Sequence, residues 1–191
     1  MKTRKVLLDD KVIHVRGSRP RINTSISFRF DIPAARNAQQ SLRETELLQG
    51  NFVISTLPNI QKSACMRQVL DLEHSIKKNL QQTKLVHISS DAAIHWKEVD
   101  ELHPKLKARA YTLNGLDAKT KQEFADMFGV GVVESERIAH GIFGLKDGKI
   151  ITAMIPRQQM GNPNVSVFVR RYKAAIAKNC PQKFYGHIQR R

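Results

Sequence analysis

The hydrophobic and polar positions of the chain alternate between a period of two and a helical period. Near the start, two short apolar runs, at 6–8 and 11–15, flank the dipeptide Asp9-Asp10. Short β-prone runs on either side of a polar turn are typical of paired antiparallel strands. The pattern therefore predicts an N-terminal β-hairpin.

The clearest element pattern follows Gly50. The run 51–56 is β-prone and apolar, and a similar run occupies 84–89. Between them, from Met66 to Leu80, apolar residues recur at helical spacing, with two lysines near the end. Strand, helix and strand in this order predict a βαβ unit with a right-handed crossover.

The second half of the chain continues the alternation. The predicted elements are a helix capped by Asp91 and ending at His103, a helix from Asp117 to Gly129, strands at 138–145 and 149–155 around a Lys146-Asp147-Gly148 turn, and a last helix opened by Asn162-Pro163. The order β-α-β, helix, β-β, α is that of the thioredoxin fold with one helix inserted. We expect an α/β domain over 1–179, with a central mixed β-sheet flanked by helices, and a basic tail at 180–191.

Composition limits the class of protein and the cellular compartment to which the chain can belong. The chain has 191 residues, of which 41% are hydrophobic and 26% charged, as in globular domains. Its apolar runs are too short for a membrane span, and its basic first residues lack the apolar core of a secretory signal. Two cysteines without a CxxC spacing predict a reducing compartment, cytoplasmic or organellar.

The net charge of +15 is concentrated at the two ends of the chain. Residues 1–30 hold eight basic and two acidic residues, net +6, and residues 162–191 hold seven basic residues and no acidic ones, net +7. One interpretation is an anionic partner, such as nucleic acid, an acidic protein surface or anionic lipid. The other is a pair of solvated ends that aid solubility.

Cys65 is the candidate for chemistry. It falls where a strand gives way to a helix, so free backbone N–H groups and the helix dipole favour its thiolate. Lys62 and Arg67 add positive charge nearby, and Pro58 lies upstream as a shield. These features predict a pKa below the ordinary cysteine value and a nucleophilic or redox-active thiol. The alternative is a small buried residue at a strand–helix junction.

Several segments resemble, in the same order, the bacterial thiol peroxidase branch of the peroxiredoxins. They are the N-terminal 12–17, the active-site segment 55–65, Ile88-Ser89-Ser90-Asp91, Phe128-Gly129-Val130, and the closing 141–149. The resemblance spans about residues 5 to 178. It implies a thioredoxin-like fold, a homodimer, and a peroxidatic cysteine at Cys65 that peroxide oxidises to a sulfenic acid, which a second cysteine then resolves.

The departures from that family lie at its chemical positions. The active-site threonine is replaced by Lys62, and Ser63 carries a hydroxyl one place too late. Pro58 is displaced by one residue from the general pattern, as in this branch. His140 aligns with the family's arginine, and Asp100 or a neighbour aligns with the resolving cysteine. Each loss removes a donor or a thiol that peroxide chemistry uses.

The other candidates are weaker. Asn179-Cys180-Pro181 resembles the C-terminal resolving segment of a different peroxiredoxin branch, so Cys180 is either a resolving cysteine or an incidental surface thiol. The seven histidines are scattered without a metal spacing, and there is no glycine-rich phosphate loop. We therefore predict neither a metal nor a cofactor.

Two hypotheses follow. The first is a thiol-dependent peroxide reductase that acts through Cys65 with Pro58, Lys62, Ser63 and His140 around it, of altered or impaired activity, using an external thiol as reductant. The second is a catalytically decayed peroxiredoxin fold, kept as a structural or binding subunit that contacts an anionic partner through its basic ends.

Overall fold

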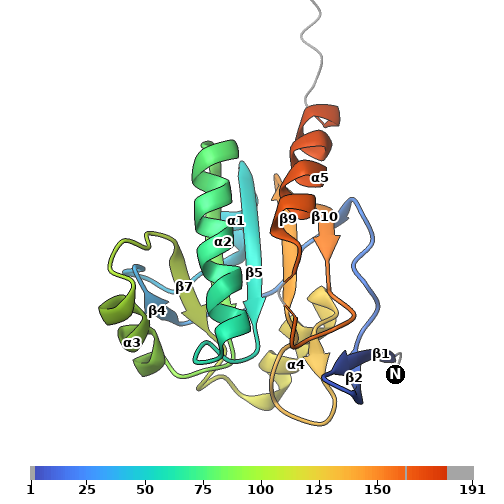
Figure 1. The fold of residues 1–191 in the computed structure, drawn as a ribbon. Helices are drawn as coiled ribbons and strands as arrows, with labels where there is room; N and C mark the ends of the chain where they lie inside the picture. Colours follow the sequence, from blue (N-terminus) through green and yellow to red (C-terminus); the bar gives the residue numbers. More distant parts are fainter. Residues whose placement is uncertain (1–2, 162, 180–191) are drawn as a thin grey trace, which may run out of the picture.

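The computed structural model describes residues 3–161 and 163–179, and its centre is a seven-stranded mixed sheet (Figure 1). The strands lie in the order β3 (Thr24–Ser25), β10 (Lys149–Met154), β9 (Gly141–Lys146), β5 (Asn51–Leu57), β6 (Thr83–Ser89), β7 (Arg109–Thr112) and β4 (Ala34–Arg36). β5, β6 and β7 run parallel, whereas β9 is antiparallel to β5 and to β10. The predicted mixed sheet is confirmed.

The βαβ unit is formed by β5, α2 (Ser63–Asn79) and β6. The two strands pair in parallel from Asn51 opposite Thr83 to Leu57 opposite Ser89, as predicted. Of the apolar residues at helical spacing in this segment, Val69, Ile76 and Leu80 are buried, whereas Leu70 is 38% exposed. The buried face of α2 also includes Cys65, Gln68 and Leu72.

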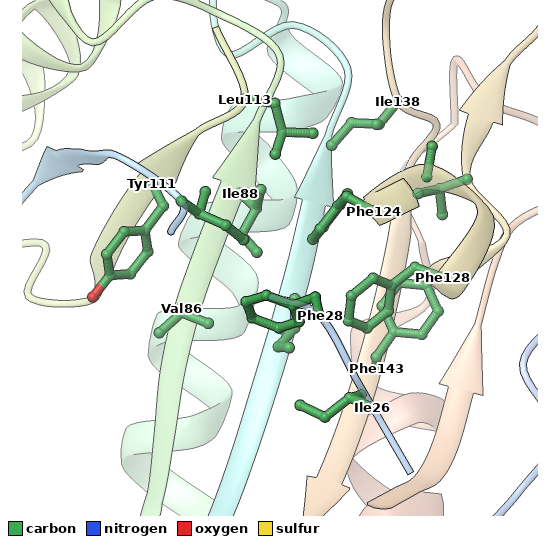
Figure 2. Packing of buried hydrophobic residues seen from close by; sticks show 14 of the residues in the cluster. Ile26, Phe28, Val86, Ile88, Tyr111, Leu113, Phe124, Phe128, Ile138 and Phe143 are labelled. Atoms are coloured by element: carbon green, nitrogen blue, oxygen red, sulfur yellow. The ribbon is translucent and has the colours of Figure 1, made fainter. Parts of the chain in front are cut away.

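Helices cover both faces of the sheet. α2 and α5 (Val165–Lys178) lie together on one face, and α4 (Ala118–Phe128) lies on the other (Figure 1). Because side chains alternate along a strand, Phe52 of β5 joins the core beneath α4, whereas Val53 packs beneath α2 and α5. Figure 2 shows Phe124 and Phe128 of α4 within the first of these cores, which also includes Phe143 of β9.

The N-terminal hairpin is confirmed as β1 (Thr3–Leu8) paired with β2 (Lys11–Arg16). β2 also pairs with β8 (Gly131–Val132), which gives a separate three-stranded sheet. This sheet brings the N-terminal segment beside the chain that leads into β9. That placement matters because β1 and β2 supply part of the cavity described below.

Several predicted boundaries are confirmed. Asp117 caps α4 by accepting a hydrogen bond from the backbone N–H of Thr120, and α4 ends at Gly129 in the left-handed conformation. The turn between β9 and β10 has positive φ at Asp147 and Gly148, which suits the expected tight hairpin.

Other boundaries are wrong. Asp91 does not cap a helix, since α3 (Ile94–Leu102) begins after Ala93 and the Asp91 carboxylate binds elsewhere. The last helix is capped by Asn164, which accepts from the N–H of Val167, so Pro163 precedes it. The strand predicted to begin at residue 138 begins three residues later, as β9 at Gly141.

The short elements β3, β4, β7 and α1 (Glu44–Leu47) were not expected. Among the described residues, no helix is long and apolar enough to cross a membrane.

Candidate active site

Cys65 lies in the first turn of α2, three residues after Lys62, which occupies the position preceding the helix. The thiol is almost fully buried, with 1% of the residue exposed. Its Sγ accepts a hydrogen bond from the backbone N–H of Asn59 at 3.4 Å. This bond fixes the sulfur against the loop that joins β5 to α2.

The predicted low pKa of Cys65 is wrong. Burial raises the pKa of the thiol to about 12, more than the Asn59 N–H lowers it. The charged groups that act on the thiol are Asp91, which raises the pKa, and Arg137, which lowers it. Lys62 and Arg67, on which the sequence argument relied, are both exposed to solvent. The thiol is therefore protonated at neutral pH.

His140, at the position that aligns with the family's arginine, does lie beside Cys65. Its Nε2 is 3.5 Å from the Cys65 Sγ, and both residues are buried. Its backbone N–H donates to the side-chain oxygen of Gln159 at 2.7 Å, which holds the residue at the entry to β9. Burial lowers the pKa of His140 to about 4, so the imidazole is neutral at physiological pH.

Gln68 fixes the orientation of this imidazole. Its amide nitrogen donates to the Ser55 hydroxyl at 2.8 Å and approaches the carbonyl oxygens of Thr56 at 3.4 Å and Gly141 at 3.3 Å. The amide oxygen therefore faces His140, with 2.8 Å between Oε1 and Nδ1. Sequence reasoning missed Gln68, although a polar residue one helical turn after Cys65, among buried apolar positions, was a usable signal.

Arg137 was also missed. Its guanidinium donates to the carbonyl oxygen of Pro58 at 2.5 Å and to Asp91 Oδ1 at 2.9 Å. The other carboxylate oxygen of Asp91 accepts the backbone N–H of Ile60 at 2.6 Å. Arg137 and Asp91 together hold the loop before α2, and thereby the backbone N–H that contacts the thiol.

A cavity of about 300 Å³ opens beside the cysteine. Its predicted members are brought together, because Pro58, Lys62, Ser63, Cys65 and His140 all line it. Side chains from distant segments complete the wall: Leu8, Ile13, Asn59, Ala64, Val132, Ser135, Arg137, Ala139, Gln159 and Met160. Cys65 and His140 thus lie side by side in the wall of one cavity.

Asp100, which aligns with the resolving cysteine of the resembling family or lies next to that position, is part of an ion pair. Asp100 on α3 accepts a hydrogen bond from Nε of Arg36 at 2.5 Å. Among the described residues Cys65 is the only cysteine, and it is free. Cys180 and the basic tail 180–191 lie outside the described residues, so the proposed role of Cys180 stays a prediction. The described part of the chain also holds no cluster of histidine, cysteine and acidic residues suited to a metal ion.

An α/β sandwich with a central mixed sheet and a buried cysteine at the start of a helix defines a thioredoxin-like class of protein. Solved structures identify the variant of that fold. A peroxiredoxin-like protein from Aquifex aeolicus matches with a TM-score of 0.72 and 14% identity, over 90% of this chain and 97% of that one. Thiol peroxidase from Chromobacterium violaceum matches with a TM-score of 0.73 and 13% identity, over 91% and 98%.

AhpC from Enterococcus faecalis gives a TM-score of 0.67 at 19% identity, over 83% of this chain and 95% of that one. No protein-family model matches the sequence. No curated protein matches it either. The fold is therefore that of the peroxiredoxins, as the sequence resemblance implied.

Proposed function

We propose that the protein reduces hydroperoxides through Cys65 and is regenerated by an external thiol. The observation that carries this proposal is the position of the Cys65 thiol, which lines a cavity together with a second reactive group, the imidazole of His140. Sulfur attack on the peroxide forms an S–O bond and breaks the O–O bond. Cys65 becomes a sulfenic acid, and the peroxide leaves as water or an alcohol.

An external thiol is needed because Asp100, which aligns with or next to the resolving cysteine of the resembling family, cannot form a disulfide. A thiol at that position of α3 would serve as the resolving cysteine of the resembling family, but its place is taken by a carboxylate that binds Arg36. A first molecule of reductant thiol then condenses with the sulfenic acid and releases water. A second exchanges with the mixed disulfide, which restores Cys65 and releases the reductant as its disulfide.

The test is peroxide consumption by the full chain with dithiothreitol present, beside Cys65→Ser and Cys180→Ser. We expect turnover in the unmodified chain and in Cys180→Ser, and none above the buffer rate in Cys65→Ser. Mass spectrometry after a single addition of hydrogen peroxide should find a sulfenic acid, trapped by dimedone, on Cys65. A chain that consumes no peroxide and gains no label contradicts the proposal.

The burial of Cys65 favours a second candidate, a decayed fold retained for binding. The thiol packs in an apolar cluster with Leu57, Ile60 and Val69, as an inert core residue would. In this case the basic ends provide the function, by salt-sensitive binding of an anionic partner such as RNA. The test compares RNA binding by the full chain, by a chain ending at residue 179, and by a chain with a scrambled tail of equal charge. Equal binding by the native and scrambled tails contradicts a specific partner.

A further inference from the structure

The hydrogen bonds around Cys65 determine where each proton of the site lies. The amide nitrogen of Gln68 is committed to Ser55 and to two backbone carbonyls, so its oxygen is the atom that faces His140 Nδ1. An amide oxygen only accepts hydrogen bonds, and Nδ1 must therefore carry the hydrogen. In a neutral imidazole this leaves Nε2 as an acceptor.

The sulfur has a matching arrangement. It accepts the N–H of Asn59, and its other polar contact among the described residues is the one to His140 Nε2 at 3.5 Å. An acceptor nitrogen at that distance receives the S–H hydrogen. Asn59 N–H, Cys65 S–H, His140 and Gln68 thus form one chain of hydrogen bonds with a single direction. A proton that leaves the sulfur has Nε2 as its adjacent acceptor.

We infer that His140 is a catalytic residue that takes the thiol proton of Cys65 and delivers it to the leaving oxygen of the peroxide, with Gln68 as the positioning residue. The peroxide step rests on the proposed function. As sulfur attacks the terminal O–H oxygen, the S–H proton moves to Nε2 and the O–O bond breaks. The Nε2 proton then passes to the departing oxygen, which leaves as water or an alcohol.

This route needs no preformed thiolate, because the thiol proton moves to His140 and then to the leaving oxygen during the reaction. Burial disfavours both the free thiolate and the imidazolium, and the ground state is the neutral pair. Charge develops only during the reaction, when the Asn59 N–H stabilises the sulfur and the Gln68 oxygen stabilises the imidazolium. This differs from a site in which a fixed arginine charge holds a thiolate.

The pH profile separates the two kinds of site. A neutral thiol–imidazole pair reacts at a rate that is constant from about pH 5.5 to 8 and falls on the acid side as His140 is protonated. A thiol that reacts only after ionising shows a rate that rises tenfold per pH unit below its pKa. The experiment uses the full chain with Cys180→Ser, so that Cys65 is the only thiol.

Two reagents are compared in this background and in His140→Gln: hydrogen peroxide, with sulfenic acid as the readout, and iodoacetamide, with alkylation as the readout. At pH 7 we expect His140→Gln to lower both rates by about 100-fold or more, the range of general acid–base catalysis, and to replace the plateau by a rising profile. Equal rates and equal profiles in the two folded chains overturn the inference. If hydrogen peroxide leaves Cys65 unoxidised in the parent, the peroxidase proposal fails, and the alkylation series alone decides the role of His140.

The role of Gln68 has its own readout. In nitrogen-15 NMR spectra of the parent, we expect His140 to carry its hydrogen on Nδ1. Gln68→Met keeps the size of the side chain but removes the acceptor, so the fixed tautomer should be lost and both rates should fall by about tenfold. Retention of the Nδ1–H tautomer and of both rates in Gln68→Met contradicts the assignment of Gln68. Circular dichroism and thermal unfolding verify that each variant is folded.

Discussion

Asp100 of α3 accepts a hydrogen bond from Nε of Arg36 at 2.5 Å. The Arg36 side chain is 1% exposed, and its other nitrogens donate to the carbonyl oxygens of Leu106 and Ala108. β4, α3 and the loop before β7 are therefore joined through one buried guanidinium. Asp100 therefore takes part in the contacts that hold these elements together.

This arrangement predicts unequal effects of its two partners on stability. Arg36→Met removes all of these bonds and leaves buried acceptors unpaired, so we expect the free energy of unfolding to fall by about 3 kcal/mol. Asp100→Asn keeps an acceptor at a half-exposed position and should cost about 1 kcal/mol. Urea denaturation at pH 7 measures both values.

The matched control is an exposed pair, Arg43 with Asp31 at 3.2 Å. Arg43→Met removes the same side chain type from a solvated ion pair and should change the free energy of unfolding by about 0.5 kcal/mol or less. If Arg36→Met and Arg43→Met are equally destabilising, the buried guanidinium does not carry the structural role assigned to it.

His87 of β6 predicts loss of stability in acid. Among the described residues neither ring nitrogen has a hydrogen-bond partner, and burial together with the charge of Arg36 lowers the pKa of His87 to about 3. The unfolded chain, with a histidine pKa of about 6.5, then binds more protons than the folded one. The stabilisation is complete above about pH 6.5 and is lost toward pH 3, at about 1.4 kcal/mol per pH unit.

His87→Leu should remove this dependence, while His140, with a pKa lowered to about 4, retains its own. Between pH 8 and pH 5 we expect the free energy of unfolding to decrease by about 2 kcal/mol less in His87→Leu than in the parent. The control is His74→Leu, the same substitution at an exposed position of α2. Parallel pH curves for the parent and His87→Leu would count against the buried neutral histidine.

The sequence could predict the parts of this fold that rest on local patterns. The strand–helix–strand unit at 51–89 follows from the spacing of its apolar residues. The cap at Asp117 and the positive-φ turn at Gly148 each depend on only a few neighbouring residues. β7 was missed because its four residues gain their strand structure by pairing with β6 and β4. For the same reason the apolar spacing does not show that Leu70 of α2 is exposed, since packing against the sheet decides which side of a helix is covered.

The candidate site divides in the same way. Cys65 could be found from its position between a strand and a helix, and His140 from the resemblance to the peroxiredoxins. The structure places the two residues together. The sign of the Cys65 pKa shift could not be found. It depends on the burial of the thiol among Leu57, Ile60, Val69 and Trp96, which a position at a helix start does not reveal. Arg137 was missed because it acts through Asp91 and Pro58, residues 46 and 79 positions away.

The close approach of Tyr172 to Gly144 predicts a strong effect of one methyl group. The Tyr172 hydroxyl donates its hydrogen to the carbonyl oxygen of Leu145 at 2.6 Å and lies 3.0 Å from that of Phe52, which holds its ring over β9. A Cβ added at Gly144 would overlap the Tyr172 ring. We expect Gly144→Ala to lower the free energy of unfolding by about 2 kcal/mol or more, measured by urea denaturation.

Gly161→Ala is the control for this substitution, because the nearest contact of its added Cβ among the described residues is Gln158 at 3.5 Å. It should change the free energy of unfolding by less than about 0.5 kcal/mol. A Gly144→Ala chain as stable as Gly161→Ala would mean that the tyrosine ring moves aside without cost.

At position 62, where the resembling family has a threonine, we expect a threonine to make the protein more stable. The carbonyl oxygen of Lys62 accepts the first hydrogen bond of α2, from the Met66 N–H at 3.1 Å, so Lys62 is the N-cap residue. An ammonium group is only a donor, and Lys62 makes no side-chain hydrogen bond to the first-turn N–H groups, those of Ala64 and Cys65. Ser63 carries a hydroxyl at the first helical position, one residue too late to act as the N-cap.

Lys62→Thr supplies the missing acceptor and should raise the free energy of unfolding by about 1 kcal/mol relative to Lys62→Ala. Lys62→Ala is the matched control, because it removes the same exposed ammonium group without adding a hydroxyl. Urea denaturation at pH 7 gives the difference, and equal stabilities would mean that the start of α2 is already satisfied by solvent.

The same two chains also test the peroxide step. The hydroxyl would lie on the cavity wall beside the thiol, so Lys62→Thr should be oxidised by hydrogen peroxide faster than Lys62→Ala. Equal oxidation rates with unequal stabilities would confine this position to helix capping.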